Sequence, residues 1–459
     1  MTATRTSIHG YWSSRFMFVL AAAGSAVGLG NVWKFPYMAG DSGGGAFVLL
    51  YFVCIALLGL PVMISEVLLG RRGRSSPANT MRTLAREEGQ SPLWGMLGVM
   101  GMLTGLLILS YYSVIAGWTL AYVLEAAEGS FSGISAQGVG EIFNRLVADP
   151  WRLMFWHTLF MVLTMFVILR GVRRGLEAAV RFLMPGLFLL ILVMVVYAVI
   201  AGDFLGGLRF LFTPDFSKIT PDVVLKAMGQ AFFTLSLGMG AIMMYGAYLP
   251  EDASIASTSV QVALTDTLIA ILAGLAIFPI VFANGLEAGQ GPGLIFTTLP
   301  LAFGHMPGGT LFGLLFFILL VFAAWTSAIS MIEPAVAWMV EKFSFTRFRS
   351  SLVCGLIVWA IGAGTVLSFN LWTRVRLLDG TAFEGKSFFD LLDYLTSNIM
   401  LPLGGILICL FAAWVMSEPS RRDELRIGHP AGYVLWRFLA RYIAPLGVVL
   451  IFLHVLGIV

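Results

Sequence analysis

The sequence has little charge. Only 12% of its 459 residues are Asp, Glu, Lys or Arg, about half of the ~25% that is usual in soluble domains. Its three cysteines all lie in apolar stretches and form neither a disulfide framework nor a metal-binding spacing. The net charge of +3 is too small, and too dispersed among short loops, to indicate nucleic-acid binding. This composition excludes a soluble globular enzyme, a disordered chain and a coiled coil.

What the chain does have is apolar surface. Hydrophobic residues make up 58% of it, and the mean hydropathy is +0.89. A bilayer core of ~30 Å needs about 20 apolar residues per helix, and only helices or closed barrels satisfy their backbone in lipid. The apolar runs are continuous rather than alternating, so we expect helices. We predict an all-α polytopic membrane protein with eleven transmembrane helices, roughly at 12–38, 44–70, 91–127, 152–169, 175–202, 220–250, 257–284, 308–342, 347–370, 389–417 and 434–458.

The basic residues predict the orientation of these helices. Arginines gather at 71–86, 170–181 and 421–441, which all lie on one side of the membrane if the helices alternate in direction. Because Lys and Arg are enriched in cytoplasmic loops, we expect a cytoplasmic N-terminus, an extracytoplasmic C-terminus and a location in the cell (inner) membrane. A polar N-terminus that runs directly into an apolar segment predicts no cleavable signal peptide.

Two of the predicted spans are interrupted by glycines. The first holds Gly24, Gly28 and Gly30, and the sixth holds Gly238 and Gly240. In one helix such glycines usually serve close packing, but two sets at corresponding positions favour two broken helices. Helices 1–5 and 6–10 form blocks of odd number, so we expect two inverted repeats, whose broken helices build a binding site at the midplane. The single domain 1–459 would then comprise repeats at 11–203 and 220–417, and an additional helix 11 at 434–459.

Four segments carry a family resemblance. AGSAVGLGNVWKFPY (23–37), GGGAFVLLY (43–51), GQAFFTLSLGMGAI (229–242) and FAAWTSAISMIEP (322–334) resemble the neurotransmitter:sodium symporter family, and above all its bacterial amino-acid transporters. The resemblance runs from about Trp12 to the end of helix 11. It implies a sodium-coupled symporter, although many members of the family have twelve helices rather than eleven.

Broken helices expose backbone carbonyls that suit a hard cation. The resemblance sorts the oxygen-bearing positions at the breaks into two sodium sites, so we expect two sodium ions. The first site would use Ala26, Asn31, Thr234 and a residue of helix 7, and the second would use Gly24, Val27, Ala323, Thr326 and Ser327. In isolation, the hydroxyls of Thr326 and Ser327 would be interpreted as bonding back to their own helix.

The sodium-site residue of helix 7 depends on how this helix is aligned with the family, and in one of two alignments it is an acid. An alignment anchored at Gly274 places Asp266 where the family usually has asparagine, whereas an alignment anchored at Pro279 places Thr265 there. We prefer Asp266, because a carboxylate in mid-membrane is costly and by default functional. Eukaryotic relatives commonly use chloride to supply this negative charge, so we expect transport that requires no chloride. A further hypothesis is that Asp266 accepts a proton when the sodium leaves.

The resemblance also outlines a substrate pocket. Monoamine transporters have an aspartate at the position of Gly28, and its loss here favours a substrate with its own carboxylate, an α-amino acid. The expected pocket is uncharged and its methionines are pliable, so we predict neutral, mostly hydrophobic L-amino acids. Its residues are Ala26, Gly28, Leu29, Gly30, Ile108, Tyr112, Phe233, Thr234, Ser236, Met239, Ala328 and Met331.

Gates are expected on both sides of this pocket. Lys34 and Asp393 match the outer ion pair, with Lys as a point charge where the family often has the forked Arg. Trp12, Tyr248 and Glu341 match the inner gate. Its basic partner is Arg5 or, by direct spacing, His9. The family also unwinds helix 5 through the spacing seen at Gly175 and Pro185, although a routine kink explains the same residues.

Two acids in the predicted membrane spans and three alternative functions remain to be considered. We expect Glu66 to be a structural hydrogen-bonding residue, and Glu333 has no assignment. A channel or sensor is disfavoured by gates on both sides. An intramembrane enzyme is disfavoured because no nucleophile lies near a base and the histidines are scattered. Proton-coupled amino-acid transport, with Asp266 as the carrier, is the alternative that sodium titration separates from symport with sodium.

Overall fold

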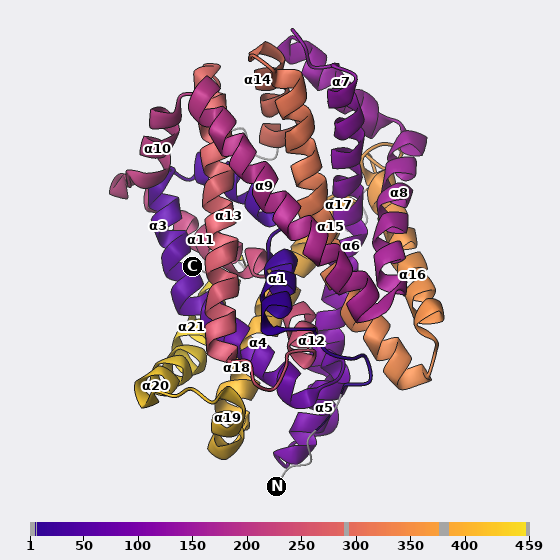
Figure 1. Ribbon diagram of the computed structural model, residues 1–459, viewed down its shortest axis with the longest axis vertical. Coiled ribbons are helices and arrows are strands. Elements are labelled where there is room, and N and C mark those ends of the chain that lie inside the picture. The colour runs from indigo at the N-terminus through magenta and orange to yellow at the C-terminus, as the bar shows by residue number, and fades with distance from the viewer. Residues whose placement is uncertain (1–4, 6, 289–292, 376–384, 456–459) are drawn as a thin grey trace.

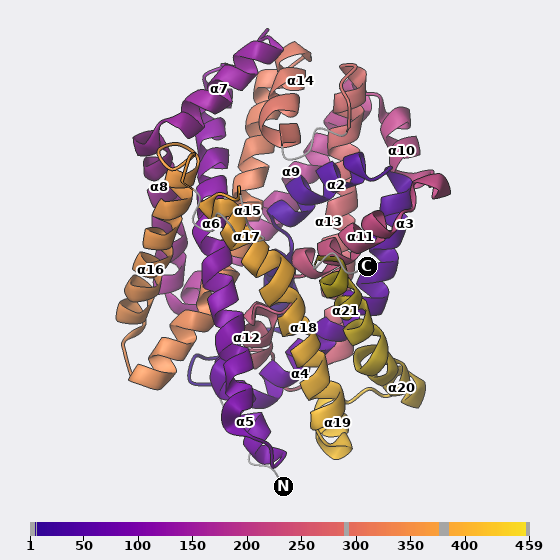
Figure 2. The same ribbon diagram turned by 180° about the vertical axis from the view of Figure 1, so that it is seen from behind.

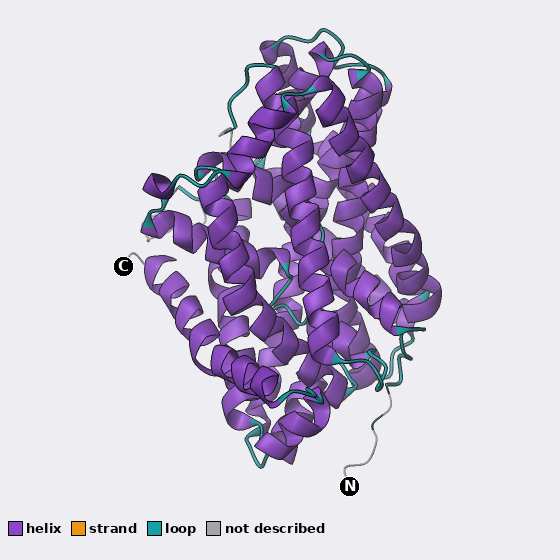
Figure 3. Ribbon diagram, turned by 60° about the vertical axis from the view of Figure 1, so that its left-hand side comes forward, coloured by secondary structure: helices purple, strands orange, loops and turns teal. Residues whose placement is uncertain are grey.

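The computed structural model of the chain describes residues 5, 7–288, 293–375 and 385–455. Within these ranges every regular element is a helix and none is a strand (Figure 3). The prediction of an all-α membrane protein is therefore confirmed. The last residues of the predicted helix 11, 456–459, lie outside the described part of the chain.

The helices divide into α-helices and short segments of other winding. The α-helices are α1 (Arg15–Ala26), α2 (Phe35–Asp41), α3 (Gly45–Cys54), α4 (Leu60–Gly73), α5 (Pro77–Glu87), α6 (Gly95–Ala127), α7 (Ala136–Ala148), α8 (Pro150–Leu169), α9 (Ala178–Ala201), α10 (Phe204–Phe212), α11 (Pro221–Thr234), α12 (Ala241–Ala247), α13 (Ile255–Ala283), α14 (Leu299–His305), α15 (Gly309–Phe343), α16 (Arg347–Ser368), α17 (Phe388–Asp393), α18 (Leu401–Leu410), α19 (Glu418–Leu425), α20 (Pro430–Phe438) and α21 (Ala444–Val455). The π-helical segments are η1 (Gly30–Lys34), η2 (Ile55–Gly59), η4 (Val172–Glu177), η6 (Leu294–Thr298), η7 (Tyr394–Met400), η8 (Phe411–Val415) and η9 (Leu439–Ile443), and the 3-10 turns are η3 (Pro92–Trp94) and η5 (Phe216–Lys218).

Among the described residues, nine helices are long and apolar enough to cross a membrane. A tenth crossing is the pair formed by α1 and the segment Gly30–Asp41, which is bent by 51°. The predicted helix 6 is divided into α11 and α12, and the six residues between them are not helical. The predicted number of eleven is reached only if α11 and α12 make one crossing together. The inverted relation of the two repeats stays a prediction.

The two ends of the molecule differ. The N-terminus, α5 and α19 lie at one end, and α7 and α14 lie at the other (Figures 1 and 2). α7, α10 and α14 occupy connections that the hydropathy pattern predicted as loops, because a search for runs of about 20 apolar residues overlooks helices that are shorter than a membrane span. In the centre, α6 and α15 pack together more extensively than any other pair of elements.

Both predicted breaks are present. α1 ends at Ala26, and Val27 is already extended, with φ −71° and ψ 105°. Between α11 and α12, residues Ser236, Gly238 and Gly240 all have positive φ. At Gly238 a side chain would also be excluded by space, because its Cβ would lie 2.4 Å from the carbonyl oxygen of Leu401. Glycine is required there both for conformation and for close approach.

Candidate functional site

A carboxylate from a neighbouring helix stabilises the break of helix 6. Glu66 of α4 is fully buried and accepts hydrogen bonds from the backbone N–H of Gly238 and, at 3.2 Å, from that of Met243. These N–H groups lie in the break and in the first turn of α12, where the helix supplies no partner. The structural role expected for Glu66 is thus confirmed, and the break is a stable feature of the fold.

The predicted ligands of the first sodium site converge on Asp266. This side chain is fully buried, and its Oδ1 accepts hydrogen bonds from Asn31 Nδ2 at 2.7 Å and from Thr234 Oγ1 at 3.1 Å. Its Oδ2 accepts one from the Tyr51 hydroxyl at 3.1 Å, a contact that the sequence did not indicate. Ala26 makes none of these contacts. Asp266 thus joins α13 to both broken helices.

The structure separates the two registers of helix 7. The Thr265 side chain is half-buried, and its hydroxyl donates to the carbonyl of Gln261 in its own helix at 2.8 Å. Asp266 points the other way, into the cluster around Asn31. The geometry therefore favours Asp266 over Thr265 as the residue of this site.

The second predicted site joins α1 to α15. Thr326 Oγ1 and Ser327 Oγ each lie 3.3 Å from the carbonyl oxygen of Val27, where α1 has ended. Thr326 Oγ1 also donates to the carbonyl of Ala323 at 3.0 Å. A Cβ at Gly24 would lie 3.5 Å from that of Thr326, so all five predicted positions lie together. Their oxygens are neutral, the kind of donor set that suits a hard cation.

A small cavity of about 10 Å³ lies between the two breaks. Ten of the twelve residues predicted for the substrate pocket line this cavity. The other two do not: Thr234 is directed to Asp266, and Ala328 is buried within α15. Ser327 lines the cavity as well. The backbone N–H of Leu29 donates to the Tyr112 hydroxyl at 3.3 Å, so a donor and a hydroxyl meet at its wall. The lining residues are Ala26, Gly28, Leu29, Gly30, Ile108, Tyr112, Phe233, Ser236, Ser327, Met239 and Met331.

A larger cavity of about 350 Å³ shares Leu29, Tyr112 and Phe233 with the small one. These three side chains therefore separate the two spaces. Lys34 and Asp393 both line the larger cavity, as expected for an outer gate. Within the described residues they form no ion pair: Asp393 accepts from Ser397 Oγ at 2.9 Å, and Lys34 lies over the Phe233 ring, 4.0 Å from its centroid. The outer pair is open in this structure.

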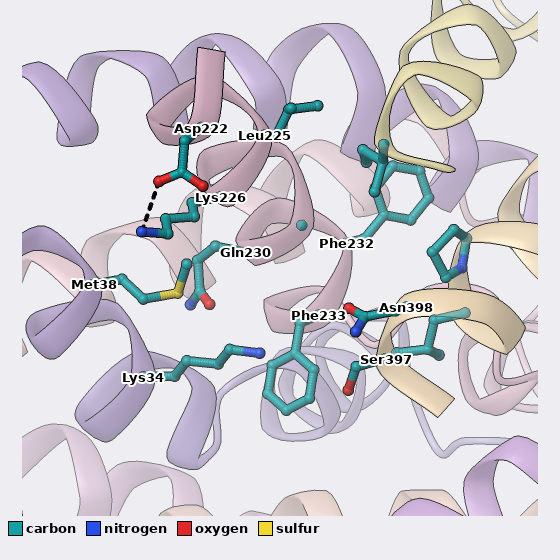
Figure 4. Close-up of a pocket in the computed structure, with 14 residues that line it drawn as sticks. Lys34, Met38, Asp222, Leu225, Lys226, Gln230, Phe232, Phe233, Ser397 and Asn398 are labelled. Atoms are coloured by element: carbon teal, nitrogen blue, oxygen red, sulfur yellow. Dashed lines mark ion pairs between the residues drawn. The ribbon is translucent and has the colours of Figure 1, made fainter. Parts of the chain in front are cut away.

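Lys34 and Phe233 also line a third cavity, of about 220 Å³, between α11, η7, α18 and α21. Figure 4 shows the amino group of Lys34 beside the Phe233 ring, with Asn398 and Ser397 opposite. Lys226 is directed away from them and pairs with Asp222 at 2.8 Å. Lys34 thus lines both of these cavities, at the outer end of the broken helices.

The inner gate is closed. Trp12 is 2% exposed, its indole donates to the carbonyl of Tyr245 at 3.3 Å, and its backbone N–H donates to that of Tyr248 at 3.1 Å. Glu341 accepts from Ser76 and Asn79, and His9 Nε2 lies 3.0 Å from its Oε1. The predicted partner Arg5 does not contact Glu341. It pairs with Glu87 at the end of α5, so of the two candidates that the sequence left open, His9 rather than Arg5 is the partner of Glu341.

A second ion pair of the inner gate was not predicted. Glu333, left without an assignment, is fully buried and receives both terminal nitrogens of Arg347, as well as the Tyr248 hydroxyl at 2.9 Å. Arg347 Nε also donates to the carbonyl of Ile168 at 2.8 Å. Arg347 therefore connects the start of α16 to α15 and α8, and Glu333 connects this pair to Tyr248 at the end of α12. No local spacing signals the pair, because its partners come from different helices.

Helix 5 begins as a π-helical segment rather than an unwound one. η4 includes Gly175, whose Cβ would lie 2.1 Å from the carbonyl oxygen of Val167, so only glycine fits there. Pro185 follows inside α9. Residues of η4 hold the chain on both sides of Trp12: Arg173 Nε donates to the carbonyl of Tyr11 at 3.2 Å, and Glu177 accepts from Ser13.

Comparisons with known proteins agree with this arrangement. The profile of the Sodium:neurotransmitter symporter family matches residues 9–132 and 135–458. YhdH, a sodium-dependent transporter of Bacillus subtilis, is 39% identical over 97% of this chain and 98% of its own length. The human sodium- and chloride-dependent GABA transporter 2 is 25% identical over 94% of this chain and 78% of its own. The crystal structure of MhsT in complex with L-phenylalanine has 40% identity and a TM-score of 0.88, and the match covers 97% of this chain and 99% of that one. The chain therefore belongs to the sodium:neurotransmitter symporter family and is a membrane transporter, not an enzyme.

Proposed function

We propose that this chain imports neutral, mostly hydrophobic L-amino acids by alternating access, with two sodium ions per substrate. The observation that supports this most is the buried carboxylate of Asp266, held by Asn31 and Thr234 at both helix breaks. A carboxylate in the membrane interior needs a positive charge nearby. A sodium ion among Ala26, Asn31, Thr234 and Asp266 supplies that charge, and the lone pairs of Asn31 Oδ1 that Gly28 N–H leaves open can bind it.

The small cavity supports an amino-acid substrate. Gly28 leaves no acid to bind an amine, and the N–H and hydroxyl at Leu29 and Tyr112 suit a carboxylate. Ile108, Met239 and Met331 form an apolar wall for the side chain. The crystal structure of MhsT contains L-phenylalanine, which supports a hydrophobic amino acid as the substrate of this chain as well. The cavity of about 10 Å³ is smaller than an amino acid, so it must widen to bind one. Pliable methionines in its wall permit this.

The charge at Asp266 also supports independence from chloride. A relative such as the human GABA transporter 2 is described as chloride-dependent. In this chain a fixed carboxylate beside the first sodium site supplies the negative charge that chloride would bring. The same residue is the carrier in the proton-coupled alternative, in which the proton replaces the first sodium.

The cavities support a cycle in which an outer and an inner gate close in alternation. The outer space is open at Lys34 and Asp393, and the inner end is closed by Trp12, Tyr248 and Glu341. Inward opening would then withdraw Trp12 and loosen the start of helix 5 at Gly175 and Pro185. With the N-terminus in the cytoplasm of the cell, this direction of transport is import.

Binding of labelled L-phenylalanine to the purified protein tests the proposal. We expect saturable binding that rises with sodium when gluconate replaces all chloride, and none when potassium replaces sodium. Saturable binding in potassium that increases at low pH would support the proton-coupled alternative instead. Saturable binding in sodium only when chloride is present would contradict the role given to Asp266.

A further inference from the structure

An apolar groove lies on the membrane-facing surface between α8 and α16, away from the transport path. It has a volume of about 410 Å³. Its one polar side chain among aliphatic and aromatic ones, Thr158, already accepts the Trp359 indole N–H at 2.9 Å, so its walls offer only hydrocarbon. Phe166 and Phe348 are more than half exposed at its edges. The residues that line it are Thr158, Met161, Val162, Met165, Phe166, Leu169, Phe348, Leu352, Gly355, Leu356 and Trp359.

The end of the groove nearest the N-terminus of the chain is basic. The guanidinium of Arg170 lies over the Phe166 ring, 3.9 Å from its centroid, at the point where α8 ends. Arg349 follows Phe348 directly and lies one helical turn before Leu352, so it lies at the edge of the same groove. Both arginines are exposed, and within the described residues neither forms an ion pair. Glu333 lies in α15, which packs against both α8 and α16, and it is already bound by Arg347.

This end of the groove also lies at the boundary of the membrane. α8 ends at Leu169 and α16 begins at Arg347, and both are membrane-length helices. The partial positive charge at the N-terminus of α16 is offset by the partial negative charge at the C-terminus of α8, so the two arginines supply the positive charge at this end. Apolar walls therefore meet a cluster of positive charge at the depth where lipid acyl chains meet their headgroups.

We propose that this groove binds an anionic phospholipid, with an acyl chain between α8 and α16 and the phosphate between Arg170 and Arg349. A zwitterionic phospholipid fits less well, because its ammonium group would lie beside two arginines, and none of the described residues that line the groove is an acid. A free phosphate ion would leave the apolar groove unused. The charge and the hydrocarbon surface together select a lipid with a net negative headgroup.

Arg347 links a lipid bound in this groove to the stability of the protein. Its Nε donates to the carbonyl of Ile168 and closes the seam between α8 and α16, while its terminal nitrogens hold Glu333. A lipid on this seam is expected to stabilise α16 against α8. The folded protein should therefore unfold at a higher temperature when the anionic lipid is bound.

Native mass spectrometry of the delipidated protein tests the proposal, with phosphatidylglycerol and phosphatidylcholine of identical acyl chains as probes. We expect the wild-type protein to bind phosphatidylglycerol more tightly and to gain thermal stability from it alone. The double variant R170Q/R349Q should lose this preference, with binding of phosphatidylglycerol weakened on the order of tenfold. The matched control R86Q/R374Q removes two exposed arginines of the same charge elsewhere and should keep the preference.

A second variant tests the contribution of the apolar groove to lipid binding separately from that of the arginines. L352W fills the groove from an exposed position and should weaken binding of both lipids without changing the preference between them. Equal binding of the two lipids by the wild-type protein would overturn the proposal. So would an unchanged preference in R170Q/R349Q, or equal losses in that variant and in R86Q/R374Q.

Discussion

Glu177 binds Ser13 with both carboxylate oxygens: Oε2 accepts the backbone N–H at 3.0 Å and Oε1 accepts the hydroxyl at 2.5 Å. Arg181 also pairs with Oε1 at 2.8 Å. Ser13 follows Trp12, the residue that closes the inner end, and Glu177 is the last residue of η4, the π-helical start of helix 5. Since the side chain of Arg173 holds Tyr11 as well, withdrawal of Trp12 breaks contacts to η4 on both of its sides.

The variant E177Q tests whether these two segments open together. Removing the charge weakens hydrogen bonds that are each worth about 1.5–3 kcal/mol when charged. We expect faster amide hydrogen exchange both around Trp12 and in 172–177, by a similar factor, and weaker sodium-dependent closure. E418Q, which removes an exposed acid of α19, should leave both segments unchanged. Faster exchange in only one of the two segments would contradict the coupling.

The variant D266N tests the role of the fixed carboxylate. Without its negative charge the first sodium site loses its counter-charge, so we expect uptake in D266N to require chloride. Uptake by reconstituted protein, compared in chloride and in gluconate, measures this. T265V changes the neighbouring residue, whose hydroxyl bonds only within its own helix, and should remain independent of chloride. Uptake by D266N that proceeds equally well in gluconate would contradict the assignment.

The variant G28A tests the central cavity. A Cβ at Gly28 would lie 2.3 Å from Ser327 Oγ and 3.1 Å from the Tyr112 hydroxyl, so Ser327 would have to move. That movement breaks its contact with the Val27 carbonyl, a position of the second sodium site. We expect at least a tenfold rise in both the substrate KM and the sodium concentration for half-maximal uptake.

Gly229 provides the control for G28A. A Cβ there meets no atom within 4 Å, and the residue lies inside α11 with negative φ. G229A should therefore leave transport unchanged, and its effect on stability should be neutral to favourable. If G28A transports as well as G229A does, the cavity is not where the substrate binds.

The pair of Glu333 and Arg347 predicts a non-additive double variant. R347Q leaves a fully buried carboxylate without its partner, which typically costs about 3–5 kcal/mol. The double variant E333Q/R347Q removes both charges and should be more stable than R347Q alone. Thermal unfolding of the two single variants and the double variant measures the coupling. Additive losses of stability would show that the two side chains do not stabilise one another.

The features that could be predicted from the sequence are those that recur along the chain or lie within short segments of it. Continuous apolar runs marked the spans, and the glycines of the first and sixth spans marked the breaks at Val27 and at 235–240. The sequence motifs also placed Asp266 and Asn31, which the fold brings within 2.7 Å of each other. These features depend on local conformation and on hydrophobicity, which sequence patterns express directly.

Contacts between distant segments were harder to predict. The sequence left both Arg5 and His9 open as the partner of Glu341, and only the packed structure shows that His9 faces it. Arg347 and Glu177 carried no signal at all, because arginine and glutamate near helix ends are ordinary boundary residues. Their partners are known only after the helices have been packed.

Uptake by reconstituted vesicles tests the central claim most directly. Labelled L-phenylalanine would be supplied outside, with an inward sodium gradient in one set of vesicles and potassium in its place in the other. We predict accumulation above the outside concentration only with sodium, and its collapse when an ionophore dissipates the gradient. Equal accumulation in potassium, driven by a pH gradient instead, would contradict sodium coupling through the site at Asp266.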